Sequence, residues 1–227
     1  MINVDIRNDV AYIEMNDGKA NVFSPAMIEG FNAALDKAEA EATAVVISGA
    51  GDKFSAGFDL SVMQQGGNAQ WEMILGGFEL LVRLYEHPQP VISAVGGHAL
   101  GMGAFTLLVS DTRIGIEGDY KLGLPETMGN MQFTNFLVAI LQAELNPMFM
   151  KSAALQSQFC NPKSAVTAGF LDLVVPAEHL DATLEKATEG LKQLPLKQYA
   201  HNKVELRQDD LDTLKSRLAL LKQTLLG

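Results

Sequence analysis

The sequence predicts an α/β domain whose first half carries the sheet and whose second half is helical. The chain has 227 residues, 48% of them hydrophobic, which is enough for one domain with a large core. Strand-like and helix-like stretches alternate up to about residue 117, and only helical patterns follow beyond residue 120. Two short glycine-containing stretches each follow a β-branched run and lead into a helical pattern, as turns of an α/β fold do.

The N-terminal part of the chain predicts three strands and a helix. Residues 2–15 alternate between apolar and polar positions and predict two paired strands. Ser24-Pro25 predicts a helix start, with serine as the N-cap and proline at the first helical position. The helix then places apolar side chains at helical spacing, namely Met27, Phe31, Ala34, Leu35 and Ala38. Residues 44–48 predict a buried strand, and the polar stretch 64–68 predicts a mobile loop.

The alternation of strands and helices continues through the middle of the chain. Residues 71–86 have the period of a helix, which ends at His87-Pro88. A strand is expected over 90–95, an apolar helix over about 103–109 and a further strand over 113–116. The remaining helical patterns lie at about 133–145, 147–155, 162–168, 177–193 and 208–226.

Charge and residue usage exclude several classes of partner. A formal net charge of −10 opposes binding to nucleic acid and to anionic membrane surfaces. The single cysteine, Cys160, permits no intrachain disulfide, and the first residues lack the pattern of a signal peptide. No apolar run approaches the roughly 20 residues that span a bilayer. The histidines at 87, 179 and 201 lack metal-ligand spacing. We therefore expect a cytoplasmic protein without a metal site.

The two glycine-containing stretches carry the main functional signal. They are Phe54–Leu60, after the strand pattern at 44–48, and Gly96–Gly103, after the strand pattern at 90–95. A strand that ends at a small turn and restarts as a helix leaves backbone N–H groups unpaired at the helix entrance. Two such turns side by side would direct two donors at one point, which suits a developing oxyanion.

Several segments of the chain together resemble the crotonase superfamily, the enoyl-CoA hydratase/isomerase fold. They occur in the family's order and are Phe54–Leu60, Pro90–Gly103, Ser110–Ile114, Gly123–Glu126 and Ser164–Pro176. The resemblance implies a spiral of ββα repeats with a helical C-terminal region, an acyl-CoA thioester ligand and assembly into a homotrimer or hexamer. It divides the chain into a core, 1–190, and a helical oligomerisation segment, 191–227. An apolar stripe in the last helix predicts a partner surface, with packing on its own domain as the alternative; it is formed by Leu211, Leu214, Leu218, Leu221 and Leu225.

The resemblance also implies roles for individual residues. Phe58 and Met102 match the oxyanion-hole positions, which act through their backbone N–H groups, so their side chains do not matter for donation. Hydratases of this family use two glutamates. The first of these positions is Phe105 here, and phenylalanine cannot activate water; the second is Glu126. A single carboxylate suffices to carry a proton from C2 to C4, so the site looks most like that of a Δ3,Δ2-enoyl-CoA isomerase. Without the resemblance, Glu126 would be interpreted as a solvated, inert acid.

Further residues are candidates for binding the coenzyme A portion and the acyl group. The resemblance points to the backbone around Lys19, Ala20 and Ala56 for the adenine end, while Lys19 and Lys53 are candidates for the phosphates. Asn130 either lines an acyl pocket or belongs to a turn, and Phe105 is a further candidate for binding the substrate. His98 faces the pocket or is a hydrogen-bonded structural histidine. No cofactor is expected besides coenzyme A as part of the substrate.

Two alternatives to isomerisation follow from the missing carboxylate. One is hydration of a 2-enoyl-CoA by a one-carboxylate site, and the other is a non-catalytic acyl-CoA-binding protein. The chain lacks the G-x-S-x-G pattern of serine hydrolases. It also lacks a G-x-G-x-x-G pattern after a strand, so a dinucleotide cofactor has no support.

Overall fold

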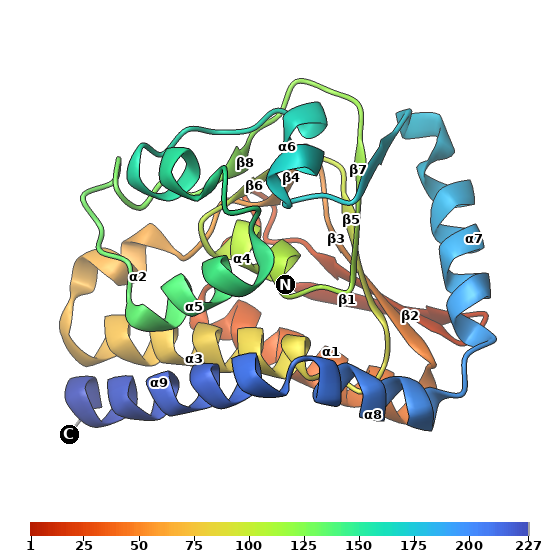
Figure 1. The fold of residues 1–227 in the computed structure, drawn as a ribbon, viewed down its shortest axis with the longest axis horizontal. Helices are drawn as coiled ribbons and strands as arrows, with labels where there is room; N and C mark the ends of the chain where they lie inside the picture. Colours follow the sequence, from red (N-terminus) through yellow and green to blue (C-terminus); the bar gives the residue numbers. More distant parts are fainter. Residues whose placement is uncertain (227) are drawn as a thin grey trace.

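A six-stranded sheet forms the centre of the molecule. The computed structural model describes residues 1–226, and Figure 1 shows the arrangement of its elements. The first two strands pair antiparallel and all the others parallel. In spatial order the strands are β1 (Ile2–Arg7), β2 (Val10–Met15), β3 (Ala44–Gly49), β5 (Val91–Val95), β7 (Thr112–Ile116) and β9 (Leu173–Val175). The predicted α/β class is confirmed, and the sheet is mainly parallel.

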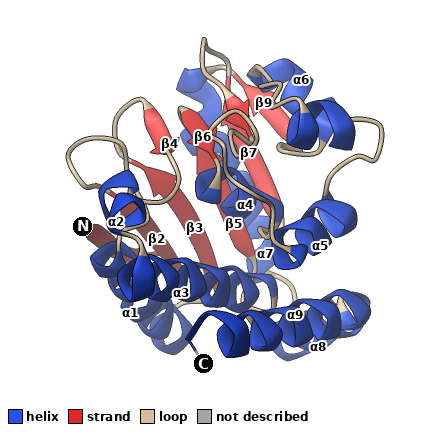
Figure 2. Ribbon diagram, turned by 90° about the vertical axis from the view of Figure 1, so that its left-hand side faces the viewer, coloured by secondary structure: helices blue, strands red, loops and turns tan. Residues whose placement is uncertain are grey.

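A second, smaller parallel sheet was not predicted as a sheet. Its strands are β4 (Lys53–Ser55), β6 (His98–Leu100) and β8 (Leu122–Gly123). Each follows a strand of the large sheet directly in sequence, so that β3–β4 and β5–β6 lead into helices as ββα repeats. Figure 2 shows β4 and β6 together beside the large sheet. Strands of two or three residues are too short to show a period of two, which is why the sequence indicated only turns there.

Helix α1 (Pro25–Glu41) begins where the sequence predicts. The Ser24 hydroxyl accepts a hydrogen bond from the Met27 N–H at 3.2 Å and caps the helix. All five predicted apolar side chains of this helix are buried. The mobile loop expected at 64–68 is wrong: α2 (Leu60–Gln65) and α3 (Gly67–Tyr85) occupy it, separated by Gly66 alone. The polar residues there lie on exposed helix surface, which the composition did not distinguish from a loop.

The sequence predicted a purely helical second half, but the structure contains strands there as well. Strands β8 and β9 lie within it, and the segment expected as a helix over 147–155 contains only a short π-helix, Lys151–Leu155. An unforeseen helix, α8, covers Leu196–Leu206. The predicted helices are present as α4 (Met102–Leu108), α5 (Asn135–Glu144), α6 (Pro162–Ala168), α7 (Leu180–Lys192) and α9 (Gln208–Leu226).

Helix α9 packs on its own chain, alongside α3 and α5 (Figure 1). Leu211, Leu214 and Leu218 are buried in the main core, and Leu221 and Leu225 pack against it. The interpretation of this stripe as a surface that needs a partner is therefore wrong. The stripe covers apolar surface within the chain and gives no argument for an oligomer.

Helices cover both faces of the large sheet. Leu184 of α7 packs on one face with Val46, Ile92 and Ile114, while α1, α3 and α4 pack on the other face in the main core. Alternate residues of each strand therefore point into two different apolar clusters, as burial on both faces requires. Within residues 1–226, no helix combines the length and apolar character that crossing a bilayer demands.

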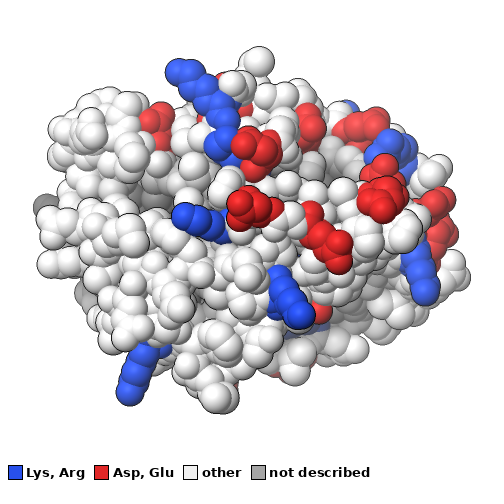
Figure 3. All heavy atoms as spheres, turned by 90° about the horizontal axis from the view of Figure 1, so that it is seen from above, with Lys and Arg blue, Asp and Glu red and all other residues white. Residues whose placement is uncertain are grey.

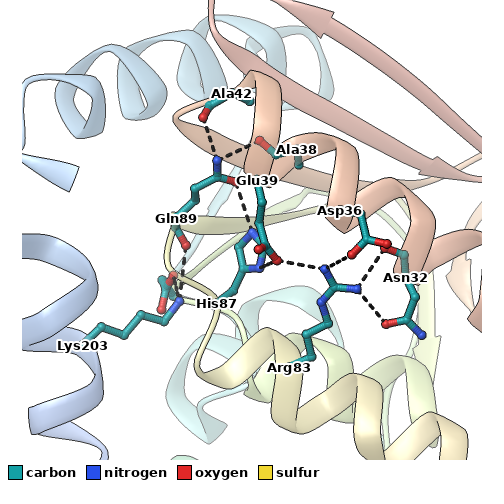
Figure 4. Close-up of polar contacts among 10 residues, drawn as sticks. Asn32, Asp36, Ala38, Glu39, Ala42, Arg83, His87, Gln89 and Lys203 are labelled. Atoms are coloured by element: carbon teal, nitrogen blue, oxygen red, sulfur yellow. Dashed lines mark hydrogen bonds and ion pairs between the residues drawn. The ribbon is translucent and has the colours of Figure 1, made fainter. Parts of the chain in front are cut away.

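A buried polar network joins α1, the end of α3 and α8 (Figure 4). The Gln89 side-chain amide donates to Ala38 O at 2.8 Å and Ala42 O at 2.6 Å, and its oxygen lies 3.2 Å from His87 Nε2. The Lys203 Nζ donates to Asp111 Oδ2 at 2.7 Å. These contacts satisfy polar groups that the surrounding apolar core would otherwise leave without partners.

Candidate active site

The first glycine-containing turn connects β4 to α2. Gly57 has a φ of +100°, which favours glycine, and its N–H donates to Ser55 Oγ at 3.1 Å. The carbonyl of Gly57 accepts from the Phe23 N–H at 2.8 Å. Helix α2 then starts after Asp59, whose carboxylate accepts from the Ser61 N–H. Among the described residues, the Phe58 N–H donates to no other group of the chain.

The second turn connects β6 to α4, and, as in the first turn, a glycine with a positive φ precedes the donor residue. Gly101 has a φ of +52°, and its N–H donates to Gly123 O at 3.1 Å. Met102 is the first residue of α4, so its N–H has no partner within the helix. Within residues 1–226 no other group accepts from it. Each turn therefore provides one unpaired backbone donor.

The two turns pack backbone to backbone. A Cβ built on Gly57 would lie 3.1 Å from Leu100 O and 3.5 Å from Met102 N. One built on Gly103 would lie 2.6 Å from Ser55 O, so the start of α4 also rests directly on β4. This approach is possible only because both positions are glycine. As a result, the donors of Phe58 and Met102 lie in the same part of the molecule.

Glu126 lies next to these turns. It follows β8 and Pro125, its residue is 8% exposed, and its Oε1 atom lies 3.4 Å from the point that a Cβ on Gly101 would occupy. Its Oε2 atom is buried, and the structure shows no hydrogen-bond partner for it within residues 1–226. Burial raises the pKa of Glu126 to about 7. A carboxyl group with this pKa can accept and return a proton near neutral pH.

Phe105 is the residue that departs from the two-carboxylate pattern. It lies in α4 and is fully buried, and its N–H donates to Gly101 O at 3.0 Å. It therefore belongs to the helix that starts at the second turn, and it supplies no acid or base. A substrate next to Glu126 meets no second carboxylate from this position.

The residues expected at the coenzyme A end lie on a neighbouring segment. The Ala56 N–H donates to Ala20 O at 3.0 Å, so these two residues are brought together. Lys19 is exposed, and Lys53 forms an ion pair with Asp52 at 2.6 Å. Figure 3 shows one face of the molecule, on which acidic and basic side chains are interspersed.

Asn21 supports this segment, and sequence reasoning missed it. Its side chain is buried and donates to Ala50 O at 3.0 Å and to Lys53 O at 2.8 Å. Asp17 completes the support, since its carboxylate accepts from the N–H groups of Lys19, Asn21 and Val22. Asp and Asn side chains characteristically bind nearby backbone in this way, which is the signal that could have found them.

Asn130 and His98 both take part in local hydrogen bonds to the backbone. Asn130 is exposed with a φ of +55°, and its N–H donates to Thr127 O at 3.2 Å, as expected of a turn residue. His98 Nδ1 accepts from the Lys121 N–H at 3.1 Å.

A separate cavity of about 370 Å³ lies between α1, α2 and α3, and none of the predicted site residues lines it. The described residues contain no cluster of metal-ligating side chains.

Comparison with known proteins identifies the family. The model of the enoyl-CoA hydratase/isomerase family matches residues 5–225. This chain belongs to that family. The match spans nearly the whole sequence, and it confirms the resemblance drawn from the motifs. The chain is thus an enzyme of the enoyl-CoA hydratase/isomerase family, with the crotonase fold.

Individual family members agree in fold but differ in the activity they are named for. A putative enoyl-CoA hydratase from Thermus thermophilus is 29% identical over 204 residues, covering 86% of this chain and 79% of the relative. A family protein from Pseudomonas syringae is 32% identical, with a TM-score of 0.95 over 99% of this chain and 97% of its own. An enoyl-CoA isomerase from Mycobacterium tuberculosis is 30% identical, with a TM-score of 0.91 over 98% and 97% of the two chains.

Proposed function

We propose that this family member moves a proton on an acyl-CoA thioester, most simply converting a 3-enoyl-CoA to a 2-enoyl-CoA. The observation that carries the proposal is the buried Glu126 carboxylate, whose Oε2 has no hydrogen-bond partner among the described residues. It lies beside two turns whose Phe58 and Met102 N–H groups also have none there, and Phe105 stands where a second carboxylate would be. The roles of Phe58, Met102 and Glu126 are part of this proposal.

The proposed reaction uses one base twice. The N–H groups of Phe58 and Met102 donate to the thioester oxygen while the Glu126 carboxylate removes a proton from C2. The electron pair of that C–H bond passes into an enolate, whose negative oxygen the two donors stabilise. The double bond then shifts from C3–C4 to C2–C3 as Glu126 returns the proton to C4. Proton and charge balance without a second acid or base.

The coenzyme A portion would lie along the Ala20 and Ala56 backbone, with Lys19 or Lys53 near its phosphates. The hydrogen bond between Ala56 and Ala20 supports this placement, because it brings the two backbone segments together next to the first turn. The proposed chemistry needs no cofactor besides the coenzyme A portion of the substrate. A homotrimeric or hexameric assembly and a cytoplasmic location stay predictions.

Hydration of a 2-enoyl-CoA is the second candidate, and the names of relatives favour it. The Thermus thermophilus relative is called a putative hydratase, and several further relatives are called carnitinyl-CoA dehydratases. Hydration requires water to be activated and the α-carbon to be protonated, so here Glu126 would have to perform both steps. The missing carboxylate at Phe105 is the reason for placing hydration second.

Absorbance of the conjugated thioester distinguishes these activities. The purified protein is incubated separately with 3-enoyl-CoA and 2-enoyl-CoA of several chain lengths. A rise in absorbance from the 3-enoyl substrate supports isomerisation, because conjugation is formed. A fall from the 2-enoyl substrate, with no rise from the 3-enoyl one, would replace isomerisation by hydration. Binding of both thioesters without turnover would show a binding protein instead.

A further inference from the structure

Helix α3 lies close to the two turns at Gly77. A Cβ built on Gly77 would lie 2.5 Å from Cε1 and 2.6 Å from Cζ of Phe58, and 3.4 Å from Cε of Met102. Carbon atoms in contact normally stay about 3.5–4.0 Å apart. No side chain, not even a methyl group, therefore fits between α3 and the Phe58 ring as they stand.

The neighbouring Gly76 has no such constraint. A Cβ there would lie 3.7 Å from Cγ2 of Ile28, which is an ordinary contact. Both glycines lie in the interior of α3, where alanine favours the helix more than glycine does. Local helix preference therefore favours alanine at both positions, and close packing against a neighbour requires glycine only at Gly77.

The Phe58 ring has a further neighbour on the same helix, since Phe78 directly follows Gly77 in α3. It packs against Phe78 with ring centroids 6.3 Å apart, and Phe78 stacks on Phe136 at 4.6 Å. The backbone of Phe58 is bridged to Phe23, whose carbonyl accepts from the Asp59 N–H. A methyl group on Gly77 would have to push the ring by roughly 1 Å to restore normal contact. The residue that carries this ring also carries an unpaired N–H.

We propose that Gly77 is a positioning residue for the oxyanion site, because its missing side chain lets α3 fix the places of Phe58 and Met102 together. The inference rests on the proposed function, in which the backbone N–H groups of these two residues hold the thioester oxygen. Gly77 itself touches no substrate. It acts through the Phe58 ring and the Met102 methyl, which contact its face of the helix.

The matched pair Gly77→Ala and Gly76→Ala tests the role of Gly77. Both substitutions add one methyl group to the same helix, so they change helix preference alike. For isomerisation of a 3-enoyl-CoA, we expect Gly77→Ala to lower kcat by roughly 10- to 100-fold with little change in KM, since misplacement by about 1 Å is costly. Gly76→Ala should keep the wild-type kcat. Equal kcat values for the two folded variants would overturn the inference.

A second substitution in Phe58 provides a rescue. Phe58→Leu keeps the backbone N–H but lacks the ring atoms that the new methyl group would meet. In the Phe58→Leu background, we expect Gly77→Ala to change kcat by less than about threefold, because the Met102 methyl can still adjust. A loss as large as in the wild-type background would contradict the proposed route through the ring. If Gly77→Ala alone does not fold, the double variant compared with Phe58→Leu decides in the same way.

A spectroscopic probe separates this inference from the choice of reaction. A coenzyme A thioester of dimethylaminocinnamic acid absorbs at longer wavelength when its carbonyl accepts strong hydrogen bonds. We expect the shift on binding to wild type and Gly76→Ala, and a smaller shift on binding to Gly77→Ala. A full shift with Gly77→Ala overturns the role of Gly77 and leaves the proposed function standing. Binding to wild type without any shift would refute both.

Discussion

The Glu126 carboxylate reaches the second turn across a position that has no side chain. Its Oε1 atom lies 3.4 Å from the point where a Cβ on Gly101 would be, and Gly101 directly precedes the free N–H of Met102. The proposed base and one proposed donor are thus neighbours through a single glycine. The carboxylate can be changed without disturbing either donor, since the donors belong to the backbone.

Replacing Glu126 by glutamine should abolish most proton transfer and preserve binding. Glutamine keeps the size of the side chain but accepts no proton, so kcat for a 3-enoyl-CoA should fall by roughly 10²–10⁴. Calorimetric titration with a saturated acyl-CoA should give nearly the wild-type Kd. Glu117→Gln, at an exposed position, is the matched control and should leave kcat unchanged. Near-normal turnover of Glu126→Gln would mean that another group carries the proton.

The rate should increase with pH through neutrality. Because burial raises the pKa of Glu126 to about 7, the free enzyme holds this carboxyl group mostly protonated at pH 6 and mostly ionised at pH 8. Only the ionised form can act as a base, so kcat/KM should rise about tenfold per pH unit below pH 7 and then level off. A profile that stays flat between pH 5 and 9 would exclude Glu126 as the base.

The same buried carboxylate should reduce the stability of the folded protein at neutral and alkaline pH. Its pKa is raised in the folded state from the usual 4.5, so the folded chain retains this proton while the unfolded chain loses it. The stabilising contribution of the protonated carboxyl group to the folded state is therefore fully present below pH 4.5, and it is lost as the pH rises through 7. Urea unfolding should therefore show Glu126→Gln gaining stability over wild type across this range, by at most about 3 kcal/mol. If the difference in the free energy of unfolding between the two proteins did not change with pH, a raised pKa of Glu126 would be contradicted.

His87 should make the protein less stable in acid. The side chain is buried beside Gln89, with Glu39 Oε1 3.5 Å from Nδ1 and Arg83 and Lys203 nearby, and burial lowers its pKa from the usual 6.5. Below pH 6.5 the unfolded chain binds a proton at His87 that the folded chain does not bind. The free energy of unfolding therefore decreases by up to about 1.4 kcal/mol for each unit by which the pH is lowered. His87→Gln should lack this slope. His201→Gln, at an exposed histidine, should retain it in the same urea titration.

The leucine stripe of α9 should matter for folding of the single chain. Leu214 is buried against the core, whereas Leu220 of the same helix is 62% exposed. Leu214→Ala should lower the free energy of unfolding by about 2–5 kcal/mol, because it leaves a cavity. Leu220→Ala should change it by less than about 0.5 kcal/mol. Equal effects in urea unfolding would show that α9 does not pack as described.

The sequence predicted most long elements, with α8 as an exception, and missed the short strands. Helix α1 has a capping serine, a proline at the right position and five apolar residues at helical spacing, and each of these signals was local. Strand β9 has only three residues and forms because Leu173 and its neighbours pair with Ile114–Ile116, almost sixty positions earlier. Such pairing depends on tertiary contacts that no local pattern records.

The candidate site was predictable only in part, for a similar reason. Motif order placed Phe58, Met102 and Glu126 on the list, but the burial of Glu126 depends on how β8 and its following turn pack against the second turn. Asn21 and Gly77 were missed, because each matters through a neighbour that is distant in sequence. The leucine stripe was recognised correctly and assigned to the wrong surface, since amphipathic spacing does not say which apolar surface covers it.

Free main-chain donors at Phe58 and Met102 also affect how tolerant these positions are to mutation. Exchanging a side chain there leaves the N–H in place, so a loss of rate on replacing Phe58 or Met102 by alanine would report a displaced donor and not a deleted one. Only an imino acid deletes such a donor outright. Position 102 is the first residue of a helix, where proline is accepted, so Met102→Pro would remove this N–H together with the Met102 side chain.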